Sequence, residues 1–552
     1  MASDEVRIQN SALWASAADA MGWISELVDD RGLRRRTGSS SLTRTVEWKR
    51  KIGGLSGVNV SLPAGTYSDD TQLRLAVCRA IRSDGSFDVE AFAKIELPAW
   101  STYCLGAGRG TKAAAANLAK RDVTWFSNFF SSSKGTDYVQ AGGNGAAMRI
   151  QPHVWANVGE LERGNYITNV VRDSLVTHGH MVGVCGAMFH ARCLAHVFSN
   201  SDHSGPDEWQ HFVDEFRDIE KVIRDDGLLS QFWLGAWEEI SGRSLTQAID
   251  EVIEKATTYI DFAKKVRRGS PDAYVTLLDS MECRGRYLGA GLNTAIAASY
   301  LAWAHPDVEV AVRQACNVLG SDTDTIGTMT GALAGALSDG PPVWILQDRE
   351  YISQEARRMY LVASGQKNAS FTYPDIAVWR APQSQSDALG SVGDRIAVRG
   401  LGLARAIGEP IVSASSAWQW VRLDFGQTIL CKSKVGKSMR IAEIQLPGRP
   451  MEGHRSKASA RSAVVDRAQV SPDMPRSSGL FDKVERQSSN ELFTSNNYTL
   501  DELTDRVIRS QFDPLVLGEC FKLSVSGPGA IERSVAFASI IAKAITARRK
   551  KA

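Results

Sequence analysis

The segment that most restricts the fold spans residues 321–337 and has the sequence SDTDTIGTMTGALAGAL. Gly327, Gly331 and Gly335 recur every four residues, so they lie on one face of a helix. Glycine in a helix interior costs roughly 1 kcal/mol relative to alanine. A glycine face of this kind is favoured where another element must approach closely. The segment therefore predicts a helix packed very closely against another part of the fold.

Two acidic clusters stand at the start of predicted helices about 250 residues apart. One opens the glycine-rich helix, and the other opens the helical pattern of residues 67–81, YSDDTQLRLAVCRAI. They offer only oxygen donors, which Mg²⁺ and Mn²⁺ prefer, whereas Zn²⁺ favours nitrogen or sulfur. Four carboxylates exceed the charge of one divalent ion, so the clusters together predict two ions. The predicted ligands are Ser68, Asp69, Asp70, Asp322, Asp324 and Thr325.

The alternative is that each cluster is only a helix N-cap. Ser, Thr and Asp are the preferred capping residues, and the helix dipole favours carboxylates at that end. The presence of both clusters together with the glycine face favours the metal site, provided that the fold brings the clusters together.

The same segments resemble a known protein family. The sequence SDDT at residues 68–71, followed far downstream by DTDTIGxxxGAxxGA at 322–336, is similar to motifs of the ADP-ribosylglycohydrolases, relatives of the dinitrogenase-reductase-activating glycohydrolase. Residues 17–26, AADAMGWISE, resemble the opening helix of that family. Residues 143–149, GNGAAMR, and the pair Thr177-His178 match two further motifs. The resemblance covers roughly the first 365 residues.

This resemblance implies an all-α bundle of many helices and gives roles to individual residues. Glu26 is implied as the acid/base or water-orienting residue. Asp70 and Asp324 are implied as metal ligands that catalysis requires, with Asp324 bridging the two ions, and Asp19 is expected to support the site or cap a helix. The ADP-ribose part of the substrate is implied to contact Asn144, Gly145, Met148 and His178.

Two departures from the family pattern concern the N-terminal region. Ala18 replaces a usual glycine, and a long insert separates Glu26 from Ser68 and contains three consecutive arginines, residues 34–36. Neither removes a predicted ligand, but the insert leaves the substrate preference open. A separate run, GAGRGTK at residues 106–112, lacks the spacing of a Walker phosphate loop, so we interpret it as a turn into a helix.

Composition places the chain among soluble globular proteins. Hydrophobic residues make up 43% and charged residues 23%, and 552 residues leave room for two or three domains. The start of the chain does not resemble a signal peptide, and no stretch approaches the roughly 20 apolar residues of a membrane span, so no membrane association is expected. The eight cysteines are scattered without a Cys-x-x-Cys motif, which favours reduced thiols in a cytoplasm.

Charge is unevenly distributed along the chain. Residues 366–552 hold 27 Lys/Arg and 18 Asp/Glu, a net charge of +9. The whole chain holds 64 Lys/Arg and 62 Asp/Glu. The first 365 residues therefore hold 37 Lys/Arg and 44 Asp/Glu, a net charge of −7. The basic part suits nucleic acid or an acidic protein as a partner. The alternative is a basic surface that docks on the acidic domain.

The pattern predicts a mainly α protein with four regions. Residues 1–365 are the catalytic domain, with helices expected at Gln72–Ile81, Thr111–Lys120, Asn165–Thr177, Gln210–Ile223, Ser244–Arg267, Gly289–Ala304 and Glu350–Ser364. Residues 366–447 are a small β-rich domain, with strands expected at Phe371–Arg380, Arg395–Arg399, Trp418–Phe425, Ile429–Lys434 and Met439–Gln445. Residues 448–498 are a Ser/Arg/Pro-rich linker, and residues 499–552 are helices that open with the capping box Thr499-Leu-Asp-Glu502.

Two functions from different classes follow. The first is a metal-dependent hydrolase that cleaves the glycosidic bond at ribose C1″ of an ADP-ribosylated protein, nucleic acid or small molecule. The second is a non-catalytic ADP-ribose sensor or immunity protein that uses the same pocket. The complete ligand set together with Glu26 favours the enzyme. The sequence leaves the acceptor open between arginine, serine, a nucleic-acid base and a free metabolite.

Overall fold

A computed structural model describes residues 2–448, apart from 55–56, 132–134, 271 and 437–438, together with residues 499–525 and several positions between 534 and 545. The chain divides into two compact units, Met1–His454 and Arg455–Ala552. The predicted linker, residues 448–498, lies outside the described residues apart from residue 448.

The glycine face packs closely against another element, as the sequence predicted, and that element is the first helix of the chain. Along α17 (Thr323–Gly335), the three glycines face α1 (Asp4–Ser25) in antiparallel order. A Cβ atom on Gly331 would lie only 2.5 Å from the carbonyl oxygen of Trp14. A Cβ atom on Gly22 of α1 would lie 2.3 Å from the carbonyl oxygen of Thr323. The two backbones therefore touch where either helix has a glycine.

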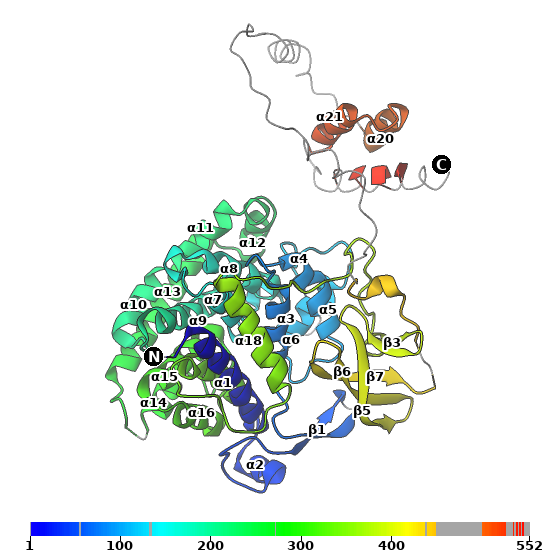
Figure 1. Cartoon of the computed structure of the whole chain (residues 1–552). Coiled ribbons are helices and arrows are strands. Elements are labelled where there is room, and N and C mark those ends of the chain that lie inside the picture. The colour runs from blue at the N-terminus through cyan, green and yellow to red at the C-terminus, as the bar shows by residue number, and fades with distance from the viewer. Residues whose placement is uncertain are drawn as a thin grey trace, which may run out of the picture. The chain divides into compact units, whose positions relative to one another are not determined.

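Helices surround this central pair, and the prediction of a mainly α fold is confirmed (Figure 1). The expected helix at 210–223 is divided between α10 and α11, whereas the other expected helices are present with small shifts at their ends. The remaining helices of the first unit are α2 (Asp30–Thr37), α3 (Asp69–Ala80), α4 (Val89–Ala91), α5 (Leu97–Trp100), α6 (Arg109–Leu118), α7 (Gln151–Trp155), α8 (Asn165–Thr177), α9 (Met181–Asn200), α10 (Pro206–Asp214), α11 (Arg217–Asp225), α12 (Leu234–Ser241), α13 (Leu245–Lys265), α14 (Ala273–Ser280), α15 (Gly291–Ala304), α16 (Val308–Asn317) and α18 (Arg349–Ala363).

One helix among the described residues, α9, is long and apolar enough to cross a membrane by length and composition alone. It is 89% buried inside the protein and packs against α8 and α15. Its apolar character is therefore that of a central helix in the hydrophobic core.

Two antiparallel sheets complete the first unit. A hairpin of β1 (Trp48–Ile52) and β2 (Val58–Leu62) lies within the insert after Glu26. A five-stranded meander joins β3 (Leu389–Val392), β4 (Arg395–Val398), β5 (Gly402–Ser413), β6 (Ser416–Leu423) and β7 (Thr428–Lys434) in that order. Strands β4, β6 and β7 agree with the prediction, whereas β3 and β5 were not predicted. Residues 371–380 form no strand, and residues 439–445 give only a bridge from Arg440 to Ser391 and a short 3₁₀ helix.

The meander shares a core with the helices. Val398, Trp418 and Val421 of the sheet belong to the same buried apolar cluster as α1 and α17. A buried ion pair between Arg79 and Glu96 is completed from the C-terminal side, because Arg79 donates a 2.8 Å hydrogen bond to Gln427. Residues 366–448 thus belong to the same compact unit as the helices, whereas the sequence analysis placed a domain boundary at residue 365.

The second unit includes the helices α20 (Leu500–Arg509) and α21 (Pro514–Ser524), and its described positions between 534 and 545 are also helical. The predicted capping box is present. The Thr499 side chain accepts a hydrogen bond from the Glu502 amide at 3.3 Å, and Glu502 accepts one from the Thr499 amide at 2.8 Å.

Candidate active site

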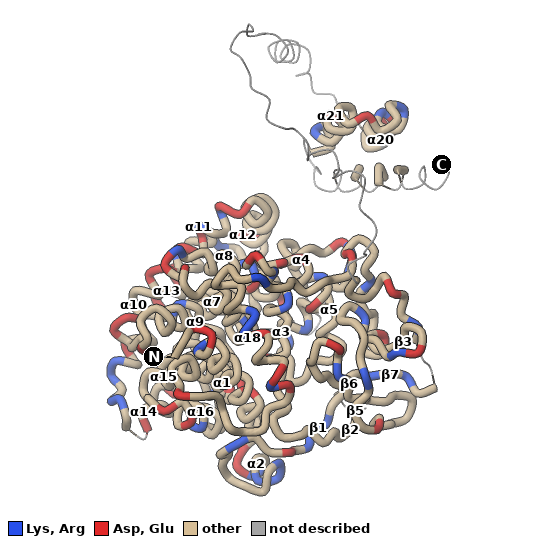
Figure 2. The backbone as a smooth tube through the Cα atoms, in the orientation of Figure 1, with Lys and Arg blue, Asp and Glu red and all other residues tan. Residues whose placement is uncertain are grey.

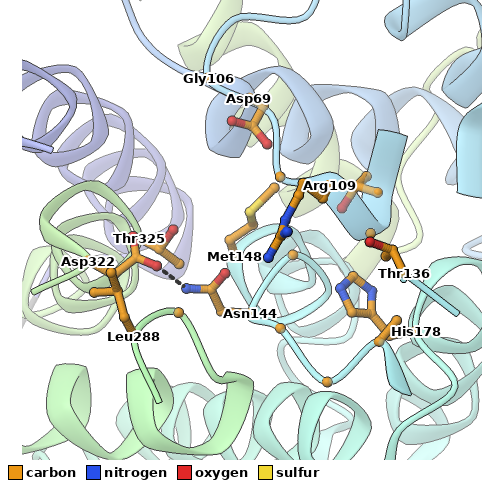
Figure 3. A pocket seen from close by; sticks show the side chains of 18 of the residues that line it. Asp69, Gly106, Arg109, Thr136, Asn144, Met148, His178, Leu288, Asp322 and Thr325 are labelled. Atoms are coloured by element: carbon orange, nitrogen blue, oxygen red, sulfur yellow. Dashed lines mark hydrogen bonds between the residues drawn. The ribbon is translucent and has the colours of Figure 1, made fainter. Parts of the chain in front are cut away.

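The two acidic clusters meet at one cavity of about 410 Å³ in the first unit (Figure 3). Thr325 donates a hydrogen bond of 3.5 Å to Asp70, which joins the start of α17 to the start of α3. Five of the six predicted metal ligands line this cavity, together with the predicted acid/base: Glu26, Asp69, Asp70, Asp322, Asp324 and Thr325. Ser68 does not line it. Its hydroxyl instead accepts a hydrogen bond from the Asp70 amide at 3.3 Å, so Ser68 is the N-cap of α3.

Helix α1 positions both clusters. Its C-terminal end meets the start of α17, where the Thr323 hydroxyl donates to the Gly22 carbonyl at 2.9 Å. Glu26 caps α1 at this end and therefore lies beside the α17 aspartates. Two turns earlier, the Asp19 carboxylate accepts hydrogen bonds from the amides of Ser68 at 3.1 Å and Thr71 at 3.0 Å. Asp19 thus fixes the N-terminus of α3, in agreement with its expected supporting role.

The acidic end of the cavity carries more negative charge than its protein neighbours offset. Burial, followed by repulsion from neighbouring carboxylates, raises the pKa values of Asp69, Asp70 and Asp324. Burial and Asp322 raise the pKa of Glu26 to about 7, although Arg50, 3.5 Å away, opposes the shift. One carboxylate oxygen of Asp70, Oδ2, is buried and has no hydrogen-bond partner. Protons or cations are needed to stabilise this arrangement.

The opposite end of the cavity is a glycine-rich loop at residues 142–145, packed against His178. A Cβ atom on Gly145 would lie 2.8 Å from the Thr111 hydroxyl and 3.0 Å from Cε1 of His178, so this position has room only for glycine. Arg149 donates to the Gly145 carbonyl at 2.6 Å and to the Thr177 hydroxyl at 2.9 Å. The predicted GNGAAMR and Thr-His motifs are therefore one hydrogen-bonded structure.

The same network fixes the state of His178. Burial and the nearby Arg149 guanidinium lower the pKa of His178 to about 3, so the ring is neutral near pH 7. Nδ1 of His178 lies 2.7 Å from the Thr177 hydroxyl, which already accepts a hydrogen bond from Arg149. The Thr177 proton is consequently available to Nδ1, and we infer that the ring carries its own proton on Nε2. Nε2 faces the glycine-rich loop, where it can donate to a ligand.

Asn144 connects the two ends of the cavity. Its side-chain amide donates to Oδ2 of Asp322 at 2.9 Å, as the dashed line in Figure 3 shows, and to the Thr294 hydroxyl at 3.2 Å. The Asn144 backbone amide donates to the Gly289 carbonyl at 2.9 Å. The four predicted substrate-contacting residues, Asn144, Gly145, Met148 and His178, all line the cavity.

Comparison with known proteins identifies the family of the chain. A family model described as ADP-ribosylglycohydrolase matches residues 3–369, more than half of the 552-residue chain. The chain belongs to the ADP-ribosylglycohydrolase family. A solved structure described as an "ADP-ribosylglycohydrolase-related protein complex" is 18% identical, with 65% of this chain and 99% of that chain covered and a TM-score of 0.42. None of the curated proteins matches the chain.

The cavity of this family member has the donor chemistry that a hard divalent cation requires, namely several carboxylates and a hydroxyl. The unpartnered Asp70 Oδ2 is a further indication, because a buried carboxylate oxygen without a donor is costly. As the side chains stand, no group of three or more His, Cys, Asp or Glu residues in the described part of the chain is arranged to hold a metal ion. Ion binding would therefore involve side-chain adjustment of the cavity aspartates.

Sequence reasoning missed part of the cavity wall. The run at residues 106–112 is a turn into α6, as predicted, but it also lines the cavity through Gly106, Gly108, Arg109, Gly110 and Thr111. Among the described residues, Arg109 provides the one cationic side chain of the lining, and Figure 3 shows it pointing into the cavity. The cluster of glycines before a helix start was the available signal. Leu288 and Gly289 also line the cavity, and no motif marked them.

Proposed function

We propose that this ADP-ribosylglycohydrolase is a divalent-metal-dependent hydrolase that cleaves the glycosidic bond at ribose C1″ of an ADP-ribosylated substrate. The family is one of hydrolases, and the single observation that carries the proposal is the polarity of the cavity. Five of the six carboxylates of the lining, all but Asp137, stand at the ends of α1, α3 and α17 and form one end, while a glycine loop, a helix N-terminus and a neutral His178 form the other. A volume of about 410 Å³ lies within the range of small-molecule sites.

The amide-rich end suits the pyrophosphate of ADP-ribose. Helix α6 begins at Arg109, and the N–H groups of a first helical turn have no partners within the helix. Such a terminus attracts anions, and the Arg109 side chain adds a full positive charge. The neutral His178 contributes one further donor, Nε2, without a charge that varies near pH 7. The acidic end would repel phosphate, so the ligand has one favoured orientation.

The acidic end would then face the ribose and the bond to be cleaved. Asp69, Asp70, Asp322, Asp324 and Thr325 would hold two Mg²⁺ or Mn²⁺ ions, which supply charge for binding ribose hydroxyls and for activating water. Departure of the acceptor from C1″ leaves an oxocarbenium-like centre, which nearby carboxylates stabilise electrostatically.

Glu26 is the proposed proton-transfer group. Its pKa of about 7 means that it can hold and release a proton near neutral pH, which is the requirement for general acid–base catalysis. Arg50 and Arg36 contact the side chain and backbone of Glu26, so the carboxylate is held at the cavity rim. The chain thereby places one titrating carboxyl group beside a cluster of carboxylates suited to cations.

Turnover of a panel of ADP-ribose conjugates with Mn²⁺, with Mg²⁺ and with EDTA tests the proposal. We expect release of ADP-ribose with either metal and none with EDTA. Glu26→Gln should lower kcat by roughly 10²–10⁴-fold. The same variant should bind ADP-ribose as the wild type does, measured by calorimetry. Glu239→Gln, at an exposed glutamate of α12 that does not line the cavity, is the matched control and should leave kcat unchanged.

Two results would contradict parts of this proposal. Full kcat in Glu26→Gln would remove Glu26 as the proton-transfer group. Tight ADP-ribose binding without turnover of any conjugate by the wild type would instead identify a binding protein, which is the alternative from the sequence.

A further inference from the structure

The insert between Glu26 and Ser68 is strongly basic within an acidic part of the chain. Residues 27–62, here called the basic insert, hold eight Lys/Arg and three Asp/Glu, a net charge of +5. Since residues 1–365 carry a net charge of −7, the rest of that region carries −12. The basic insert folds as α2 and the hairpin β1–β2, and Figure 2 shows Lys and Arg along both.

Two arginines of the basic insert attach it to the rim of the cavity. Arg36 donates to the carbonyl oxygens of Ile24 at 2.6 Å and Glu26 at 3.0 Å. Arg50 pairs with the Glu26 carboxylate at 3.5 Å. The guanidinium carbons of Arg36 and Arg50 lie 4.9 Å and 5.9 Å from the ring of Trp48, which is buried in the core. These contacts fix the basic insert beside Glu26, so whatever binds its outer face lies next to the cavity.

Five exposed cations of the basic insert are without an ion pair among the described residues. Within the described residues, none of the following forms an ion pair, and all are exposed: Arg31, Arg34, Arg35, Arg44 and Lys49. A groove of about 580 Å³ runs between α2 and the hairpin, lined by Arg35, Arg36 and Lys49 on the basic side. The one acidic residue of this lining, Glu47, is hydrogen-bonded to Ser61. The groove is therefore built to receive negative charge.

We propose that the basic insert binds the phosphate backbone of a nucleic acid and that the acceptor of ADP-ribose is a nucleic acid. The second half of this inference rests on the proposed function, whereas the first half does not. The type of cation favours phosphate groups as the ligand of the basic insert, and not the carboxylate side chains of a protein. Six of the eight cations are arginines, whose planar guanidinium groups bind phosphate through paired hydrogen bonds.

The position of the basic insert also suits a long polyanion. A cavity lined by six carboxylates repels a nucleic-acid strand near its mouth. Cations anchored at Glu26 offset this repulsion at the rim, where the strand has to pass if a modified nucleotide is to enter. A short conjugate that lies wholly inside the cavity would not reach the outer cations.

Fluorescence anisotropy with a labelled, unmodified single-stranded oligonucleotide tests the first half, on the full chain and over a range of salt concentrations. The variant is Arg34→Gln with Arg35→Gln, because both side chains are exposed and neither lines the catalytic cavity. The control is Lys265→Gln with Arg267→Gln, which removes the same charge from two exposed cations without ion pairs near the end of α13. Thermal melts of both variants check that each is folded.

We expect the wild type to bind, with log K falling linearly in log salt concentration at about 0.7 per neutralised phosphate. The double variant should bind roughly tenfold more weakly and lower that slope by about 1.4, whereas the control should match the wild type. Equal affinity of the double variant and the wild type would overturn the proposal. So would binding of an acidic peptide, such as polyglutamate, in preference to the oligonucleotide.

Hydrolysis separates the two halves. The double variant should cleave a small ADP-ribose conjugate as fast as the wild type and an ADP-ribosylated oligonucleotide roughly tenfold more slowly at low substrate concentration. If no conjugate is cleaved but the oligonucleotide binds in the expected manner, the proposed function fails and the nucleic-acid surface stands. If the double variant slows hydrolysis of the two substrates to the same extent, the basic insert does not recognise the acceptor and the second half of the proposal is wrong.

Discussion

Replacing Gly331 by alanine perturbs the close backbone contact between α17 and α1 without changing any polar group. The added Cβ would lie 2.5 Å from the Trp14 carbonyl oxygen and 3.0 Å from the Ala15 Cα. Both atoms belong to the backbone of α1, so no side-chain rotation relieves the clash. Reaching an ordinary contact of 3.4 Å requires the two helices to separate by about 0.9 Å at this point. The same change at Gly235 of α12 meets no atom within 4 Å and provides the control.

The expected free-energy changes have opposite signs. Alanine is favoured over glycine in a helix by about 1 kcal/mol, so Gly235→Ala should stabilise the protein by up to that amount. Overpacking a well-packed core typically costs about 1–3 kcal/mol. For Gly331→Ala this cost lies toward the upper end, because the obstructing atoms are backbone, and it exceeds the gain in helix propensity. We expect a net loss of roughly 2 kcal/mol in the free energy of unfolding.

Urea denaturation followed by tryptophan fluorescence measures both changes. All 14 tryptophans lie before residue 421, so the signal reports on the first unit alone. The midpoint should fall for Gly331→Ala and rise or remain constant for Gly235→Ala. A Gly331→Ala protein as stable as the wild type would refute the close approach of α1 and α17, and with it the argument from the glycine face.

Three further predictions concern the cavity and its support. The pKa values of the buried cavity aspartates are raised in the folded protein. Their contribution to the stability of the fold is therefore fully present below their unfolded pKa of about 4, and it is lost as pH rises through the higher folded values. Differential scanning fluorimetry should therefore show Mn²⁺ raising the Tm more at pH 8 than at pH 5, and Asp70→Asn should reduce that difference. Arg149→Met removes the arginine partner of the buried Asp173 carboxylate, which then keeps only His153 at 3.0 Å among its described ionic partners, and should cost about 3 kcal/mol in urea unfolding. Arg163→Met at an exposed pair should cost less than about 1 kcal/mol. Asn144→Ala removes the hydrogen-bond donor to Asp322 and should lower kcat/KM by roughly tenfold or more. An unchanged kcat/KM would exclude Asn144 as the link between the two ends of the cavity.

The sequence predicted the close packing of α17 and the acidic starts of α3 and α17 because both depend on short-range patterns, whereas the meeting of the two clusters depended on the fold. Gly327, Gly331 and Gly335 mark a helix face regardless of its partner, and an acidic run before a helix start is visible in any sequence. The partner of the glycine face, α1, lies roughly 300 residues away and carries no pattern that names it. Ser68 shows the limit of the argument, since its hydroxyl is occupied as the cap of α3 although its residue type fits a ligand.

The C-terminal part of the first unit was harder to predict for a physical reason. Strand β5 is exposed along much of its length and lacks the alternation of a half-buried strand, so its sequence gives little signal. Residues 371–380 are rich in aromatic groups, but Phe371 packs against Phe425 and the Tyr373 hydroxyl donates to Glu96 at 2.8 Å. Aromatic content there reflects contacts with the helices and not a strand. Truncation at residue 365 would expose this surface, so we expect an insoluble fragment.

Packing and chemistry meet in the same two helices. Asp19 and Glu26 are seven residues apart, so they are two turns apart along α1, and they contact the start of α3 and the cavity, respectively. The carboxylates of the second cluster stand on α17, whose distance from α1 is set by glycines alone. A separation of the two helices that the protein survives would still move Asp324 relative to Glu26. Gly331→Ala should therefore lower kcat/KM even at temperatures where the variant remains folded. The control, Gly235→Ala, should leave kcat/KM unchanged. Equal activity of the two folded variants would show that the site tolerates movement of α17 against α1.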